Sequence, residues 1–340
     1  MFVEQRRGGV VESRHRVHAA VVDADDRLVA HAGEPEFVTF WRSAAKPFQA
    51  MALVADGAAD RFGITREELA LTCASHSSEA GQVQLVRDYL ARIGCSERDL
   101  MCGAHPPISE TVAKDYQTRG VRLTPVYSNC SGKHTGMLAL ARHHGWPTEN
   151  YIRADHPVQR RCLAEVSRWT GVPESQIGVG VDGCGVACFA LPVRAMARAY
   201  AKLGSGTWGV VPSDGERPSD SPGKVPPPTP HSRIVEAMLR HPELIAGEGR
   251  PCTEMMRAHP GRVITKVGAD GVYSACLVRE RLGVTLKIED GYGPASALAL
   301  AAILEELGLR PQPASLRVKT TVNSRGETVG ELRVTGGLTR

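Results

Sequence analysis

Strand-like segments stand at both ends of this chain, and helix-like segments fill its middle. Residues 16–40, 262–289 and 316–334 hold runs of β-favouring side chains bounded by turn residues, which is typical of strands, and the first and last of these ranges each predict a hairpin. Between 43 and 203, most segments repeat their apolar residues at the spacing of helices. This order predicts a two-lobed α/β protein, in which one lobe is a sheet built from both chain ends and the other is mostly helical.

The same pattern sets the boundaries that we expect for the two lobes. Residues 1–41 and 255–340 are assigned to an antiparallel sheet lobe flanked by helices, and residues 42–254 to the mostly helical lobe. A chain of 340 residues is long enough to bury a full core. Residues 204–230 are rich in Gly, Ser and Pro, so we expect them to form a surface loop or lid.

Charge and cysteine usage exclude several classes of protein. The formal net charge is only +4 and the basic residues are scattered, so we expect no nucleic-acid partner. The chain begins without an apolar leader and has no run long enough to span a bilayer, so we expect no membrane partner. Nine cysteines in such a chain favour reduced thiols over a disulfide framework, and we predict a cytoplasmic protein.

Ser43 and Lys46 stand three residues apart at the start of a helix-like segment. Residues i and i+3 share a face of a helix, so the hydroxyl and the amine can lie within hydrogen-bond reach. A desolvated lysine has a lowered pKa and, as a neutral amine, can take the serine proton and create a nucleophile. The spacing also fits a capping serine beside a solvated lysine, so the motif needs support from the rest of the chain.

Four further segments gather polar or thiol groups among small residues. They are residues 71–79, 128–134, 182–188 and 265–268. Each has a purely structural interpretation: Ser77 or Ser78 can cap a helix that begins near Glu79, and a cysteine at a helix start can be a small buried side chain. A lysine at a strand end can be solvated, or it can reach into a cleft. The residues alone leave these alternatives open.

Eight motifs occur in order along the chain. They begin at residues 42, 74, 102, 129, 155, 181, 266 and 287, and they read Arg-Ser-Ala-Ala-Lys-Pro, Ala-Ser-His-Ser, Cys-Gly-Ala-His-Pro-Pro, Asn-Cys-Ser-Gly-Lys-His, Asp-His-Pro-Val-Gln, Val-Asp-Gly-Cys-Gly-Val, Lys-Val-Gly-Ala-Asp-Gly-Val-Tyr and Lys-Ile-Glu-Asp-Gly. Together they resemble the rhizobial-type L-asparaginases, the class 3 or thermolabile family. Eight ordered motifs are far more specific than any one of them, and they cover most of the chain.

The resemblance implies a serine β-lactamase-like and glutaminase-like fold, which agrees with the two-lobed pattern. It also implies one catalytic unit over residues 1–340 that hydrolyses L-asparagine to L-aspartate and ammonia. Two Ser-Lys pairs carry the chemistry in this family, and by motif match they are Ser43 with Lys46 and Ser75 with Lys266. One serine attacks the side-chain amide while a neutral lysine takes its proton. We expect Ser43 to be acylated, because it stands at a helix start.

The resemblance further implies a Zn²⁺ ion with an unusual ligand set. By motif match the ligands are Cys130, Lys133 and Cys184. We expect the metal to support substrate binding or the shape of the pocket and not to activate water. The expected substrate-binding residues are Arg42, His134 and Asp182, of which Arg42 would pair with the α-carboxylate. A homodimer is also implied by the resemblance.

Two other functions remain open from the residues alone. Another Ser-Lys hydrolase of the same fold, such as a glutaminase, a β-lactamase or a peptidase, would share the Ser-x-x-Lys motif but would leave residues 129–134 without a role. A non-catalytic zinc-binding protein would use the thiols and dispense with the serines. The chain also departs from the family pattern, notably at Ser78, where glycine is usual.

Overall fold

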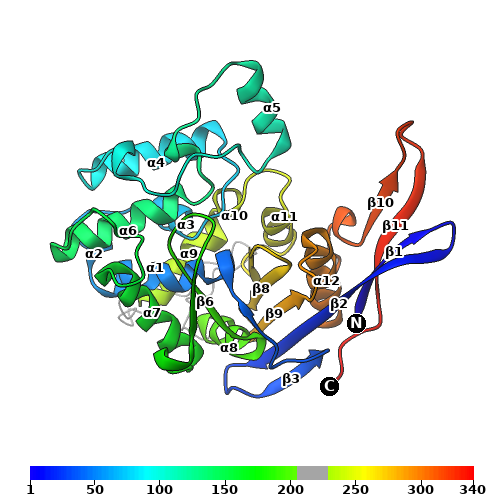
Figure 1. The fold of residues 1–340 in the computed structure, drawn as a ribbon. Coiled ribbons are helices and arrows are strands. Elements are labelled where there is room, and N and C mark those ends of the chain that lie inside the picture. Colours follow the sequence, from blue (N-terminus) through cyan, green and yellow to red (C-terminus); the bar gives the residue numbers. More distant parts are fainter. Residues whose placement is uncertain (205–228) are drawn as a thin grey trace, which may run out of the picture.

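The structure is a computed structural model, and it describes residues 1–204 and 229–340 (Figure 1). Most of the predicted loop 204–230 therefore lies outside the described residues. The strands are β1 (Phe2–Arg7), β2 (Val10–Asp23), β3 (Leu28–Ala32), β4 (Val38–Phe40), β5 (Gly178–Val181), β6 (Ala187–Pro192), β7 (Val263–Val267), β8 (Val272–Leu277), β9 (Leu282–Ile288), β10 (Val318–Val322) and β11 (Thr328–Thr335).

The described residues also contain α-helices and a few short 3-10 turns. The α-helices are α1 (Lys46–Ala55), α2 (Ala58–Arg61), α3 (Arg66–Thr72), α4 (Ala80–Arg92), α5 (Glu110–Thr118), α6 (Ser131–His144), α7 (Pro157–Thr170), α8 (Val193–Leu203), α9 (Pro230–Arg240), α10 (Pro242–Ile245), α11 (Pro251–Ala258) and α12 (Gly293–Glu306). The 3-10 turns are η1 (Arg42–Ala45), η2 (Glu97–Asp99), η3 (Pro125–Tyr127), η4 (Glu174–Gln176) and η5 (Ala314–Leu316).

The larger sheet joins the two ends of the chain. Its strands run in the order β10-β11-β1-β2-β9-β8-β7, each antiparallel to its neighbour, and β3 pairs with β2 beside this path. The first and last strands, β1 and β11, are hydrogen-bonded partners, and Figure 1 shows the two termini near each other. The predicted α/β fold, with a sheet lobe made from both chain ends and a mostly helical lobe, is confirmed.

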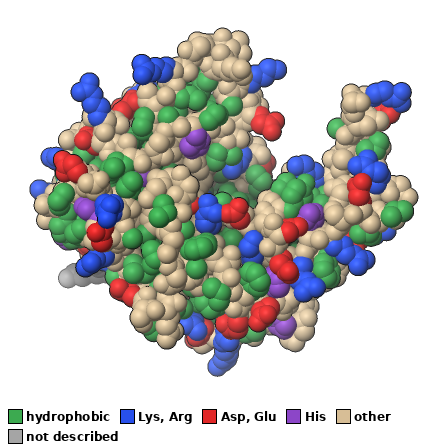
Figure 2. Space-filling view, viewed as in Figure 1, with side chains coloured by type: hydrophobic (Ala, Val, Ile, Leu, Met, Phe, Trp, Pro, Cys, Tyr) green, Lys and Arg blue, Asp and Glu red, His purple; other side chains and the backbone are tan. Residues whose placement is uncertain are grey.

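Strand β2 connects the inner and outer parts of this sheet. Its first half pairs with β1, and its second half pairs with both β3 and β9. The two hairpins predicted from the sequence, β2–β3 and β10–β11, are both present. The outer strands β10, β11 and β1, with the first half of β2, project from the body as an arm, which is visible at the right of Figures 1 and 2.

Helices cover both faces of the inner sheet. Ala20 and Val22 of β2 pack against α8. On the neighbouring strand β9, a Cβ atom at Gly283 would lie 1.9 Å from the Ala197 carbonyl oxygen of α8, so only glycine allows this approach. Because side chains alternate along a strand, Val284 points to the opposite face, where α12 packs.

The helical lobe surrounds α1, which contacts α3, α6, α7 and α9 and is almost entirely buried. The helix predicted from Ser43 begins with the turn η1, and Pro47 falls in the first turn of α1, where its missing N–H costs nothing. The structural alternative for Ser77 and Ser78, that one of them caps the helix beginning near Glu79, does not hold. Helix α4 begins after Glu79, and the Ser77 hydroxyl instead donates to the Ala246 carbonyl oxygen at 2.8 Å.

A small sheet, in the order β4-β6-β5, carries two segments toward the site. Strand β4 leads into η1, which contains Ser43, and β5 leads into the loop that contains Asp182 and Cys184. In the part of the chain that the structure describes, no helix combines the length and the apolar character needed to cross a membrane.

Candidate active site

Ser75 lies between two lysines that come from different lobes. Its hydroxyl oxygen is 3.0 Å from Lys46 Nζ, at the start of α1, and 2.8 Å from Lys266 Nζ, on β7. Ser75 follows α3, and its backbone N–H donates to the Ile245 carbonyl oxygen at 2.9 Å. The exposed fractions are 3% for Ser75, 1% for Lys46 and 0% for Lys266. The structure therefore brings together three of the four predicted catalytic side chains in a buried hydrogen-bonded group.

Burial sets the protonation of this group. Removal from water, and then the nearby charge of Lys46, lower the pKa of Lys266 to about 7. Lys266 can therefore be a neutral amine near pH 7 and accept a proton from Ser75. Lys46 Nζ also donates to the Ala74 carbonyl oxygen and to Cys130 Sγ, the latter at 3.3 Å. Its three hydrogen bonds match the three donors of an ammonium group.

Ser43 lies one turn before Lys46, but its hydroxyl is not the hydrogen-bond partner of that amine. The Lys46 backbone N–H donates to the Ser43 carbonyl oxygen, while the amine turns toward Ser75. The half-buried Ser43 side chain makes no hydrogen bond within residues 1–204 and 229–340. The structure thus joins the Lys46 amine to Ser75 by a hydrogen bond and not to Ser43. The catalytic role of Ser43 stays a prediction.

Cys130 and Cys184 form a pair of thiols next to Lys46. The hydrogen bond from Cys130 lowers the pKa of Cys184 to about 4, against the effect of burial and with help from the Lys133 ammonium. The same hydrogen bond, with burial, raises the pKa of Cys130 to about 12. Lys133 Nζ lies 3.1 Å from Cys184 Sγ. Contacts therefore run without a break from Lys133 through the two sulfurs to Lys46.

The three predicted zinc ligands are gathered in this cluster. Cys130, Lys133 and Cys184 are all buried, and hydrogen bonds link Cys184 to both of the others. The distance of 3.1 Å from Lys133 Nζ to Cys184 Sγ is shorter than the roughly 3.5–3.8 Å between neighbouring ligands of a tetrahedral zinc ion, so these two side chains would separate slightly to bind it. Thiolate donors suit zinc. Among the described residues no three His, Cys, Asp or Glu side chains gather closely enough to hold a metal. The third ligand would therefore have to be Lys133.

Arg42 connects the site to two carboxylates from different loops. Its Nε donates to Asp182 Oδ1 at 2.8 Å, and its Nη1 donates to Asp270 Oδ2. Arg42 directly precedes Ser43 and has a φ of +53°, a left-handed conformation that is uncommon outside glycine. Such residues concentrate at functional sites. The structure brings the predicted Arg42 and Asp182 together and adds Asp270, which lies in the motif that begins at Lys266 but was given no role from the sequence.

His134 is fully buried and offers one unused ring nitrogen. Its Nδ1 lies 2.6 Å from the Tyr151 hydroxyl, and its Nε2 has no partner among the described residues. The Tyr151 oxygen accepts from the Met101 N–H at 3.0 Å, and its own proton can go to His134 Nδ1; in that tautomer the ring proton of His134 lies on Nε2. Burial lowers the pKa of His134 to about 3, which keeps the ring neutral. The predicted role of His134 in binding substrate stays a prediction.

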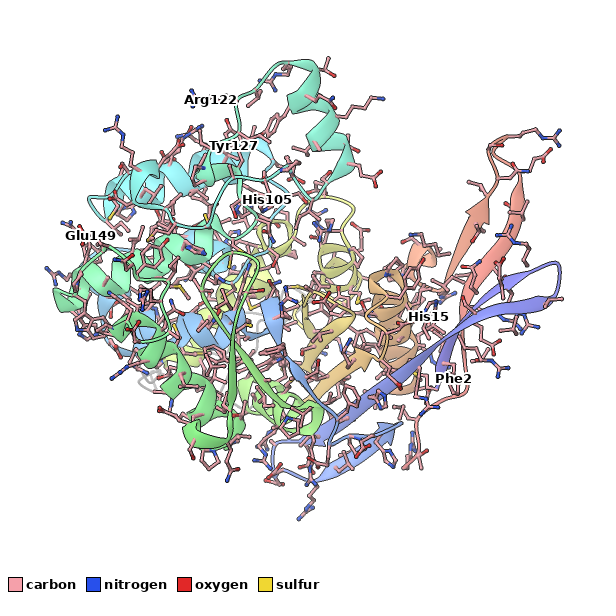
Figure 3. The ribbon with its side chains drawn as sticks, viewed as in Figure 1. Phe2, His15, His105, Arg122, Tyr127 and Glu149 are labelled. Carbon is pink, nitrogen blue, oxygen red and sulfur yellow. The ribbon has the colours of Figure 1, made fainter. Side chains whose placement is uncertain are left out.

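The loop that carries Ser75 is fixed by buried polar contacts. His76 Nε2 lies 2.9 Å from Ser131 Oγ, and its Nδ1 accepts from the Ser78 N–H at 3.2 Å. Ser78 has a φ of +61°, which explains why glycine is usual at this position in the family pattern. The Ser78 hydroxyl donates to the Tyr127 carbonyl oxygen at 2.6 Å and holds this conformation. His105, which is labelled in Figure 3, contacts Asn129 in the next part of the chain: its Nε2 lies 2.9 Å from Asn129 Oδ1.

The site combines a buried serine between two lysines with a second serine that is half-buried. The chain belongs to the L-asparaginase II family, whose model matches residues 3–334. No curated protein matches the sequence.

Two of the solved structures that match this chain are Mglu and a β-lactamase. Mglu in its native form has 15% identity and a TM-score of 0.45, over 91% of this chain and 66% of its own. This chain therefore spans slightly less than two thirds of Mglu. A β-lactamase from Mycobacterium bovis has 14% identity and a TM-score of 0.40, over 81% of this chain and 88% of its own.

Proposed function

We propose that this protein hydrolyses L-asparagine to L-aspartate and ammonia with Ser43 as the nucleophile. The observation that carries the proposal is the buried Ser75 hydroxyl, which lies within 3.0 Å of two lysine amines. Burial and Lys46 bring the pKa of Lys266 to about 7, so a neutral base exists at ordinary pH. Membership of the L-asparaginase II family supports the choice of substrate.

Acylation begins when the Ser43 hydroxyl attacks the carbon of the side-chain amide. The serine proton passes to Lys46, one turn away, once that amine has given its own extra proton through Ser75 to neutral Lys266. Collapse of the tetrahedral adduct breaks the C–N bond. The leaving amide nitrogen takes a proton from Lys46 and departs as ammonia, which leaves an ester between aspartate and Ser43.

Deacylation uses the same groups in reverse. A water molecule attacks the ester carbon while a neutral lysine takes one of its protons, and the Ser43 oxygen is reprotonated as it leaves. Ser75 is suited to carry protons between the two amines, because its oxygen contacts both of them. L-Aspartate then leaves, and the serine and the lysines return to their starting protonation.

We also propose that Cys130, Lys133 and Cys184 hold a zinc ion. When bound, the ion supplies positive charge and fixes the geometry of this wall of the pocket. Cys130 connects this cluster to the reacting groups, because its sulfur contacts the Lys46 amine. Cys184 lies two residues after Asp182, which in turn positions Arg42. Arg42 is proposed to bind the α-carboxylate, and His134 Nε2 to offer a further hydrogen-bond donor.

The assembly and the location of the protein complete the proposal. We propose a homodimer in the cytoplasm, on the family resemblance and on the nine free cysteines. Light scattering of the purified protein tests the first part, since a monomer at working concentrations contradicts it.

The experiment that tests the function is ammonia release from L-asparagine and from L-glutamine by the wild type and by Ser43→Ala, Ser75→Ala and Lys46→Met. We expect asparagine turnover that Ser43→Ala and Lys46→Met abolish and that Ser75→Ala lowers by about 10²–10⁴-fold. Turnover of glutamine in preference to asparagine would favour the rival assignment, another Ser-Lys hydrolase of this fold.

A further inference from the structure

Asp270 forms an ion pair with Arg42, the residue that precedes Ser43. Its carboxylate receives the Arg42 Nη1 hydrogen bond, and it lies four residues after Lys266 on the turn between β7 and β8. This turn is pressed against the segment before Ser43, because a Cβ atom at Gly268 would lie 2.9 Å from the Trp41 carbonyl oxygen. Arg42 therefore directly precedes Ser43, the proposed nucleophile, and Asp270 follows Lys266, a proposed base, by four residues.

The two carboxylates that hold Arg42 differ in how easily they can move. The Asp182 side chain is 10% exposed, and its Oδ1 accepts from both Arg42 Nε and the Gly183 N–H. The Asp270 side chain is 68% exposed, only its Oδ2 is engaged, and its Oδ1 has no partner among the described residues. Asp182 is thus a fixed partner of Arg42, and Asp270 is an exchangeable one.

The backbone beneath Asp270 is held firmly, although its side chain is free. Lys287 Nζ donates to the Asp270 carbonyl oxygen at 2.6 Å, and the Ile288 N–H donates to the Gly271 carbonyl oxygen at 2.9 Å. Asp270 has a φ of +53°, so the turn presents its side chain from a constrained position. A carboxylate held in this way can receive a ligand with little reorganisation of the loop.

We infer that the Arg42–Asp270 ion pair is the recognition site for the head group of a free α-amino acid, and that Asp270 binds its α-ammonium. This rests on the proposed function. When the substrate enters, its carboxylate takes the Nη1 edge of Arg42, and its ammonium takes the carboxylate of Asp270. One protein ion pair is replaced by two pairs with the zwitterion, so no charge is left without a partner. The site therefore selects a free amino acid over a peptide-linked or deaminated amide.

The test compares Asp270→Asn with the wild type on ligands that differ only in the α-ammonium. L-Asparagine and succinamic acid are compared by kcat/KM, and L-aspartate and succinate are compared by calorimetric binding. Asparagine tolerates a positive φ as aspartate does, so the turn is retained. The control is Asp290→Asn, which also removes a negative charge from a turn of the sheet lobe. Asp290 bonds to His15, which Figure 3 marks on β2.

We expect Asp270→Asn to lower kcat/KM for L-asparagine by about tenfold or more, mainly through KM, as for the loss of a charged hydrogen bond. Succinamic acid should be hydrolysed as well as before or better, and the preference for L-aspartate over succinate should vanish. Equal losses for both members of each ligand pair, no change, or the absence of binding would overturn the inference. If the wild type binds L-aspartate with this Asp270-dependent preference but does not hydrolyse L-asparagine, the proposed function fails and the inference stands.

Discussion

Lys46 and Lys266 come from opposite lobes and meet at one hydroxyl, that of Ser75, at 3.0 and 2.8 Å. Two amines so close together cannot both carry a charge without cost, because each is removed from water and feels the other. In the proposed mechanism the contact between the lobes is part of the chemistry, because the helical lobe supplies one amine and both serines and the sheet lobe supplies the second amine.

The first prediction is a pH dependence centred near pH 7. Because burial lowers the pKa of Lys266 to about 7, the neutral amine that acylation needs disappears below this pH. We expect kcat/KM for L-asparagine to fall about tenfold per pH unit in acid and to be level above about pH 8. Lys266→Arg keeps the charge at every pH and should lose most of the activity. A profile that stays flat from pH 5.5 to 8.5 would show that this group is not the base.

The second prediction concerns stability. The pKa of Lys266 is about 7 in the folded chain and 10.5 in the reference state, so the unfolded chain binds more protons between these values. Stability from this group therefore rises with pH across that window, and the full cost of burying the charge is present below pH 7. Lys266→Met removes the cost, and we expect it to be more stable than the wild type at pH 6 by about 1 kcal/mol or more. Urea unfolding at pH 6 and pH 9 measures the difference, which should be smaller at the higher pH.

Zinc binding gives the third prediction. Cys130→Ala and Cys184→Ala should each lose the metal, because each change leaves only one thiolate and the Lys133 amine in place of three ligands. Cys276→Ala is the matched control, since that cysteine is equally buried on β8 but has no role in the cluster. Elemental analysis of the purified variants decides the matter. Zinc content that is unchanged in Cys130→Ala or Cys184→Ala, or absent from the wild type, would contradict the assignment.

How far the sequence predicts this molecule varies from one feature to another. The hairpins β2–β3 and β10–β11 and the helix α1 follow from local patterns and were predicted correctly. The contact of Lys46 with Ser75 was not predicted, since it depends on how α1 and the end of α3 lie in space. Asp270 was overlooked for the same reason, because its partner Arg42 is 228 residues away along the chain.

Short-range capping gives a further example of this limit. Ser77 and Ser78 are good capping residues by type, yet both hydroxyls donate to distant backbone carbonyl oxygens. The acceptor is Ala246 for Ser77 and Tyr127 for Ser78. Propensity describes the local alternatives of a side chain, and tertiary partners decide among them. The motif match paired Ser75 with Lys266, and the structure brings these two side chains into contact, which local patterns could not predict.

The fourth prediction tests the packing of α8 on the sheet. Gly283→Ala would place a Cβ atom 1.9 Å from the Ala197 carbonyl oxygen and 2.3 Å from the Ala201 nitrogen, so the helix or the strand must move. We expect a loss of about 3 kcal/mol or more in the free energy of unfolding. Gly81→Ala is the control: it lies in the first turn of α4 with nothing within 4 Å of the added atom, and it should be neutral or stabilising. Equal stabilities of the two variants in urea would contradict the packing.

The most direct test of the central claim is ammonia release from L-asparagine by the wild type, measured beside L-glutamine and beside the Ser43→Ala variant. The account predicts turnover of L-asparagine in preference to L-glutamine, and its loss by about 10⁴-fold or more in Ser43→Ala, with the fold retained. Ammonia release from L-asparagine at the wild-type rate by Ser43→Ala, or none from the folded, zinc-supplied wild type, would contradict it.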